Sequence, residues 1–208
     1  MSGITLNPML TTQPYGTFDS TTQGYYQGDF VDDSSSYQYL EGGQIASSVS
    51  QPIWGGMAIN AAVPSTGEGN LGALLTLATT VAGTATTSVT GFTVFTKNGA
   101  AILTPGLSNV PLLASGQTAN YFSFGSNARI KVGVEASIVA SLEGGSVSQT
   151  LYWDPVLQQL TASGTSGAFA LPATVKIKSL NTNSKLVSYN SGTGAVTWAT
   201  GAVAIIQI

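Results

Sequence analysis

The sequence contains no cysteine and no histidine, and charged side chains make up only 7% of its 208 residues. Without cysteine the chain forms no disulfide bond and no thiolate metal site. Without histidine it has no Ser-His-Asp triad, no imidazole base and no histidine-ligated metal. The phosphate-binding pattern Gly-x-x-x-x-Gly-Lys-Ser/Thr is also missing. These absences exclude the commonest hydrolytic and nucleotide-hydrolysing sites.

A pair of carboxylates, as in glycosidases, is the catalytic arrangement that the composition still permits. The candidates are Glu135, Glu143 and Asp154. Glu135 falls on the polar side of a predicted strand, Glu143 lies beside a predicted turn, and Asp154 starts another turn. Because each has a structural explanation, the sequence predicts no catalytic site, and we expect a protein that is not an enzyme and uses no cofactor.

The acidic residues are gathered in the front of the chain. Residues 1–96 contain six acids and no base, whereas residues 97–208 contain six bases and three acids, which gives net charges of −6 and +3. Asp29, Asp32 and Asp33 do not form a calcium loop, because no glycine or glutamate follows at the required spacing. We expect this acidic front to face a basic surface, on either the rear half or a neighbouring copy. Neither half is basic enough to predict nucleic-acid binding.

The most apolar passage, residues 71–83, is too short to cross a membrane. It spans about 13 residues, whereas a bilayer requires roughly 20. The first residues, Met1-Ser2-Gly3, carry no basic stretch that leads into a hydrophobic run. The sequence therefore predicts neither a secretory signal nor a membrane role, and residues 71–83 are expected to form a buried strand or a short helix.

Alternating apolar and polar side chains mark the middle of the chain. Apolar residues occupy every second position from Ile130 to Ala140, which predicts a strand with one buried face. Gly144-Gly145 predicts a turn, residues 147–153 a second strand, and Asp154-Pro155 a turn before a returning strand. This stretch is expected to be a β-meander.

Similar signals recur on both sides of this meander. Asn98-Gly99 predicts a hairpin turn. The final strand, at residues 203–208, is apolar enough to need a covering or pairing neighbour. Further strands are predicted at residues 54–59, 89–97, 100–103, 121–124, 175–180, 186–189 and 195–198. We therefore expect an all-β fold: an antiparallel β-barrel or jelly-roll-like domain at residues 53–208, preceded by an extended N-terminal arm at residues 1–52.

The arm is rich in Gln, Thr, Ser, Gly and Tyr and has no sustained hydrophobic period. Aromatic side chains bury large areas with few rotatable bonds, so they are its expected interface anchors. These anchors are Tyr15, Phe18, Tyr25, Tyr26, Phe30, Tyr37 and Tyr39, and the acidic interface residues are Asp29, Asp32 and Asp33. The arm either docks on its parent domain or, as we prefer, on neighbouring subunits of an assembly.

Three segments carry a resemblance to a known family. They are residues 129–134 (Arg-Ile-Lys-Val-Gly-Val), residues 152–155 (Tyr-Trp-Asp-Pro) and residues 190–201 (Asn-Ser-Gly-Thr-Gly-Ala-Val-Thr-Trp-Ala-Thr-Gly). With these segments, residues 91–208 resemble the capsid cement, or decoration, proteins of tailed bacteriophages. The resemblance implies a compact, trimeric β-barrel or jelly roll on the outer surface of the virion, clamped over junctions between major capsid proteins.

A second function from another class stays open. A phage tail or head-fibre module that binds a receptor or a carbohydrate would have a similar composition and fold. Tryptophan rings exposed in a shallow groove would favour that module, whereas burial of Trp54, Trp153 and Trp198 would favour the structural protein.

Overall fold

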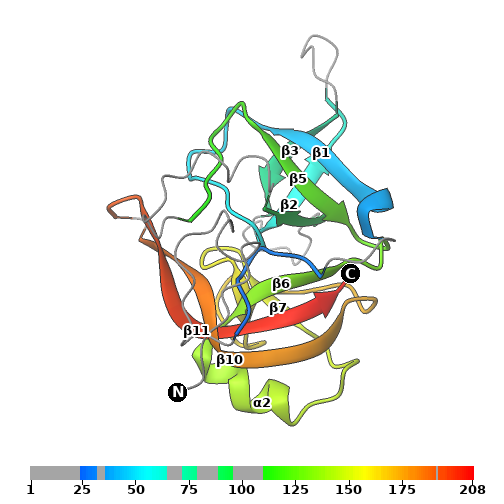
Figure 1. The fold of residues 1–208 in the computed structure, drawn as a ribbon, viewed down its shortest axis with the longest axis vertical. Helices are drawn as coiled ribbons and strands as arrows, with labels where there is room; N and C mark the ends of the chain where they lie inside the picture. The colour runs from blue at the N-terminus through cyan, green and yellow to red at the C-terminus, as the bar shows by residue number, and fades with distance from the viewer. Residues whose placement is uncertain (1–23, 32–35, 65–71, 79–88, 96–109, 191) are drawn as a thin grey trace, which may run out of the picture.

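The structure is a computed structural model that describes residues 24–31, 36–64, 72–78, 89–95, 110–190 and 192–208. Its strands form a closed five-stranded barrel and a six-stranded sheet. In the view of Figure 1 the barrel lies above the sheet. The barrel consists of β1 (Leu40–Ile45), β3 (Ala73–Leu77), β2 (Ala58–Ala62), β4 (Gly91–Val94) and β5 (Thr118–Ser123), in that order. The expectation of an all-β, barrel-containing fold is confirmed.

The six-stranded sheet is built from the rear of the chain. Its order is β10 (Lys176–Asn190), β11 (Ala195–Gln207), β6 (Arg129–Val134), β8 (Gln159–Thr161), β7 (Tyr152–Asp154) and β9 (Phe169–Ala170). The predicted hairpins β7–β8 and β10–β11 are both present and antiparallel. The predicted turn at Asn98-Gly99 and the strand at residues 100–103 lie outside the described residues.

Two pairings correct the expectation of a purely antiparallel fold. β1 runs parallel to β3, and β6 runs parallel to β8. β1 also lies within residues 1–52, so part of the expected arm is a barrel strand. Its sequence hides this role because Gly42-Gly43 interrupts the alternation, yet a Cβ on Gly43 would lie 2.7 Å from the Leu75 side chain. Glycine is needed there because β1 and β3 approach so closely.

The predicted strand at residues 130–140 is wrong beyond Val134. After β6 the chain forms a short 3-10 turn, η3 (Ala136–Ile138), and the helix α2 (Val139–Glu143), so Gly144-Gly145 follows a helix rather than joining two strands. Ile138 and Leu142 are four residues apart and both pack in the core, so the same residues satisfy helical spacing. Within the described parts of the chain, no helix is long and apolar enough to cross a membrane.

Several other expected strands begin or end elsewhere; of residues 147–153, for example, only Tyr152 and Trp153 lie in a strand, β7. Residues 54–57 precede β2 instead of belonging to it, and Gly55-Gly56 forms a turn there. β3 occupies residues 73–77 of the apolar passage, so that part of it is a strand rather than a helix.

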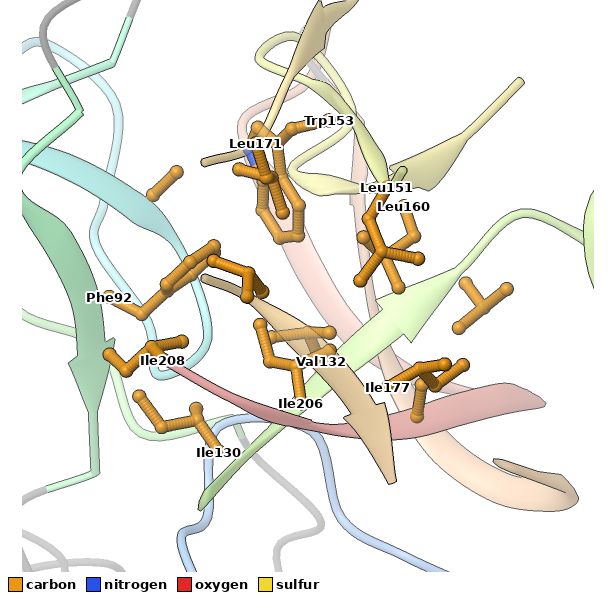
Figure 2. Packing of buried hydrophobic residues seen from close by; sticks show 14 of the residues in the cluster. Phe92, Ile130, Val132, Leu151, Trp153, Leu160, Leu171, Ile177, Ile206 and Ile208 are labelled. Carbon is orange, nitrogen blue, oxygen red and sulfur yellow. The ribbon is translucent and has the colours of Figure 1, made fainter. Parts of the chain in front are cut away.

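The barrel and the sheet share one hydrophobic core. Phe92 and Phe122 from the barrel pack with Val132, Trp153 and Ile206 from the sheet. Figure 2 shows this packing at close range, and the rings of Phe92 and Trp153 meet edge to face with their centroids 5.0 Å apart. The two layers therefore form one folding unit.

The long hairpin β10–β11 reaches from the shared core to the barrel. Its base carries Ile177 and Ile206 in the shared core, while Val187 and Trp198 near its far end pack in a second cluster inside the barrel. β11 pairs with β10 on one side and with β6 on the other. The apolar end of the chain is therefore paired on both sides within its own chain, which meets its expected need for a neighbour.

Candidate interface residues

Residues 24–31, which we call the strap, run between β6 and β10 and are hydrogen-bonded to both (Figure 1, blue). On the β10 side, the amide N–H of Lys185 donates to the Tyr25 carbonyl (2.8 Å), and the Gln27 N–H donates to the Lys185 carbonyl (2.9 Å). On the β6 side, the N–H groups of Gly28 and Val31 donate to the carbonyls of Lys131 and Arg129. The strap is thus tied to its own chain by main-chain bonds.

The strap occupies an edge of β6 that would otherwise be open. β8 pairs with β6 only at Val134, which leaves the start of β6 without a partner on that side. Phe30 forms an isolated bridge with Ile130 there, and the Lys131 N–H donates to the Asp29 carbonyl. Unpaired strand edges expose main-chain donors and acceptors, so the strap satisfies groups that β6 would leave free.

Gln27 is the strap residue that the sequence analysis missed. Its side chain is fully enclosed, and its Oε1 accepts a hydrogen bond of 2.8 Å from the Val187 N–H. A buried amide needs such partners, because an unpaired polar group inside a protein is costly. Gln27 stands among several other glutamines of the arm, so nothing in the local sequence distinguishes it.

Three expected anchors of the arm contact the body of the same chain. The Phe30 ring is buried and meets Phe122 edge to face (5.4 Å). The Tyr26 ring meets Trp198 in the same manner (5.7 Å), and the Tyr25 hydroxyl lies 3.1 Å from Ser179 Oγ. For these residues the docking surface is the parent domain, which was the less favoured alternative.

The other expected anchors divide into two groups. Tyr39 ends the 3-10 turn η1 (Ser36–Tyr39) and is exposed, and Tyr37 lies in the same turn. Tyr15, Phe18, Asp32 and Asp33 lie outside the described residues. Tyr39 is therefore a described anchor whose side chain is exposed to solvent.

Asp29 has its basic partner within its own chain. Its Oδ2 accepts a hydrogen bond of 2.6 Å from Lys131 Nζ, which also lies 6.0 Å from the centre of the Tyr25 ring. The front and rear halves thus meet through opposite charges at this point, which is one of the two arrangements that the charge segregation left open.

Two of the three candidate catalytic carboxylates, Asp154 and Glu135, accept hydrogen bonds within the fold. Asp154 is buried, and its Oδ1 accepts hydrogen bonds from the N–H groups of Val156 (2.7 Å) and Leu157 (3.1 Å). Glu135 accepts a hydrogen bond from the Thr161 hydroxyl, and this bond holds the pKa of Glu135 below its usual value. Glu143 is exposed at the end of α2.

The tryptophans are turned into the molecule. Trp54 and Trp153 are among the largest fully buried side chains, and Trp198 is half-buried between Tyr26 and Phe95. Trp153 Nε1 donates to Gln158 Oε1 (3.3 Å), and the Trp54 ring packs against Tyr189. None of these three rings forms an exposed platform for a sugar ring.

An apolar pocket opens at one end of the barrel. Its volume is about 80 Å3, and Ile53, Trp54, Phe95, Leu112 and Leu113 are among the residues that line it. Within the described parts of the chain, no group of three acidic, histidine or cysteine residues is placed to hold a metal ion. No model of a known protein family, no curated protein and no solved structure matches the chain.

Proposed function

We propose that the protein is a structural component of a bacteriophage particle, a capsid cement protein that binds the outer surface of the head and stabilises contacts between major capsid proteins. It acts as a self-associated unit, a homotrimer in our proposal, and it performs no catalysis. The resemblance of residues 91–208 to decoration proteins is the starting point for this proposal.

The burial of the tryptophans is the observation that favours a capsid cement protein over a carbohydrate-binding module. Sugar-binding modules present aromatic rings to solvent, where the flat ring face stacks on the ligand. Here Trp54 and Trp153 lie in the two hydrophobic clusters, and Trp198 packs between other aromatic rings. The aromatic area is used to join the barrel, the hairpin and the strap into one rigid body.

The composition of the surface supports the same function. With only 7% charged residues, few like charges repel neighbouring copies, and a free monomer is poorly protected against association. A lattice component benefits from this, because many weak contacts repeated over a shell act in parallel. Each contact needs little energy of its own for the shell as a whole to resist internal pressure.

The proposal is tested with heads of the phage that encodes the protein, prepared with its coding sequence deleted. Purified full-length protein is added, and the heads are separated by sedimentation. We expect saturable binding of many copies per head and a higher temperature of DNA release. An unrelated β protein of similar net charge serves as the control.

Two results would overturn the proposal. One is the absence of saturable binding to heads. The other is binding of only a few copies at the tail together with specific binding on a glycan array, which would establish the receptor-binding alternative instead.

A further inference from the structure

The turn between β7 and β8, residues 154–158, is held in one conformation by its own hydrogen bonds. Asp154 Oδ1 accepts from the N–H groups of Val156 and Leu157, and the Asp154 carbonyl accepts from the Gln158 N–H (2.8 Å). Gln158 Nε2 donates to the Pro155 carbonyl (2.8 Å). These four bonds restrict the turn to one conformation.

Gln158 also fastens this turn to both layers of the fold. Its side chain is fully buried, and its Oε1 accepts from the Ala58 N–H of the barrel (3.0 Å) and from Trp153 Nε1 of the sheet (3.3 Å). Its φ of 54° is a left-handed conformation, which is unfavourable for a residue with a side chain. The fold accepts this strain at a position where a glycine would avoid it.

This rigid turn presents two adjacent aliphatic side chains to solvent. Val156 is 70% exposed and Leu157 is 53% exposed, and we call this pair the apolar tip. Single exposed hydrophobic residues are ordinary on protein surfaces. Val156 and Leu157 differ from such single residues because they are adjacent and lie on a turn that Gln158 attaches to the fold. A partner that binds them would therefore lose little conformational entropy.

The barrel pocket has the chemistry that such a tip requires. Its lining is mainly aliphatic and aromatic, and it contains no charged side chain among the described lining residues. Leu112 is 44% exposed and extends the apolar lining towards solvent. Val156 and Leu157 are not among the pocket's lining residues, and their exposure means that the tip does not fill the pocket of its own chain.

We propose that the apolar tip of one copy inserts into the barrel pocket of a second copy. Tip and pocket are different surfaces, so the contact is heterologous, and repetition of it around an axis closes a ring. A ring of three would satisfy the homotrimer of the proposed function, on which this inference rests for its assumption of self-association. The burial of aliphatic groups in an uncharged pocket supplies the attraction.

Self-association of the full-length protein in solution tests the tip without any phage particle. Leu157→Asp is compared with Val63→Asp, which places the same charge on another aliphatic residue, 93% exposed, outside the tip and the pocket lining. We expect Leu157→Asp to raise the dissociation constant measured by analytical ultracentrifugation about tenfold or more, and Val63→Asp to leave it within about twofold. Equal effects of the two variants, or a wild-type protein that is monomeric, would overturn the inference.

Disulfide trapping tests the pairing of tip and pocket independently of stability. The chain has no cysteine, so Leu157→Cys and Leu112→Cys each introduce a single thiol. Mixing the two variants under mild oxidation should give a covalent dimer faster than either variant gives alone or than Val63→Cys gives with either. Fast dimerisation of Leu157→Cys by itself would show a tip-to-tip contact and would overturn the pocket assignment. Because head binding is measured separately, a failed pairing is distinguishable from a failed cement function.

Discussion

Gly28 of the strap and Gly55 before β2 face each other where two segments of the main chain cross closely. A Cβ on Gly28 would lie 2.5 Å from the Gly55 carbonyl carbon, and a Cβ on Gly55 would lie 2.6 Å from the Gly28 carbonyl oxygen. The Gly28 carbonyl also accepts a hydrogen bond from the Phe95 N–H (2.9 Å). Both residues are glycines because the strap and the barrel approach within main-chain contact there.

Gly28→Ala should therefore destabilise the protein strongly. Gly28 has a φ of 86°, and Gly116 has a φ of 83° but open space around it. Gly116→Ala is therefore a matched control that measures the cost of the positive φ without the steric clash. We expect Gly116→Ala to lower the free energy of unfolding by about 1 kcal/mol and Gly28→Ala to lower it by about 2 kcal/mol more. Urea denaturation measures both, and equal losses would contradict the crossing.

Glu135 makes the stability of the protein depend on pH in the acid range. The hydrogen bond from Thr161, with a further one from Ser137, lowers the pKa of Glu135 in the folded state. A lowered pKa stabilises the fold above the ordinary carboxyl pKa of about 4.3 and loses this contribution as the pH falls below it.

Glu135→Gln should therefore lower the free energy of unfolding at pH 7, and the difference from wild type should shrink as the pH falls through about 4. Glu143→Gln removes the same charge from an exposed position without removing the bond to Thr161. Unfolding curves recorded between pH 7 and pH 3 provide the measurement. A deficit in Glu135→Gln that is equally large at pH 3 would contradict the linkage.

At the scale of the elements, the sequence pattern predicted strands best where one face of the strand is buried and the other is exposed. The hairpin of β10 and β11 and the turn at Asp154-Pro155 follow from alternation and turn residues. β1 was missed because Gly42-Gly43 removes the alternation that marks a strand. The strand predicted at residues 135–140 failed because Ile138 and Leu142 fit a helix equally well, and tertiary packing decided between them.

The candidate interface residues were predicted less well than the strands. Tyr25, Tyr26 and Phe30 were recognised as anchors, but their partners Ser179, Trp198 and Phe122 lie too far along the chain for local pattern to indicate them. The same holds for the attachment of the turn at residues 154–158 to the barrel, which comes from the hydrogen bond that the Ala58 N–H donates to Gln158.

The strap should behave as part of the folded domain. Deleting residues 2–31 removes Phe30 from the core and Gln27 from Val187, and it reopens the edge of β6. We expect the free energy of unfolding to fall by at least about 3 kcal/mol, the loss that removal of one buried phenylalanine side chain produces. Phe30→Ala in the full-length chain should reproduce much of this loss in urea denaturation. A deletion variant as stable as wild type would refute the structural role.

At the scale of the whole molecule, the barrel and the sheet share side chains rather than meeting at a boundary. Phe92 packs on Trp153, and the far end of the β10–β11 hairpin completes the core of the barrel. We therefore expect neither layer to retain its core when the other unfolds.

The two layers should therefore unfold in one transition. One variant keeps only Trp54 and reports on the barrel, and another keeps only Trp153 and reports on the sheet, with phenylalanine at the other tryptophan positions. In each variant, the fluorescence transition in urea should coincide with the loss of far-UV circular dichroism. A clear separation of the two curves in either variant would show that the layers are independent domains.

The position of the strap has a consequence for the order in which the protein is completed during translation. The strap leaves the ribosome before its β10 partners, because Ser184 and Val187, which bind Tyr25 and Gln27, are synthesised 159 and 160 residues later. The strap can therefore pair with β6 first, and its bonds to β10 must wait until Lys185 and Val187 have been made. A nascent chain that stalls before Lys185 lacks the β10 residues that bind Tyr25 and Gln27, so the contact between strap and hairpin forms only after β10 has been made.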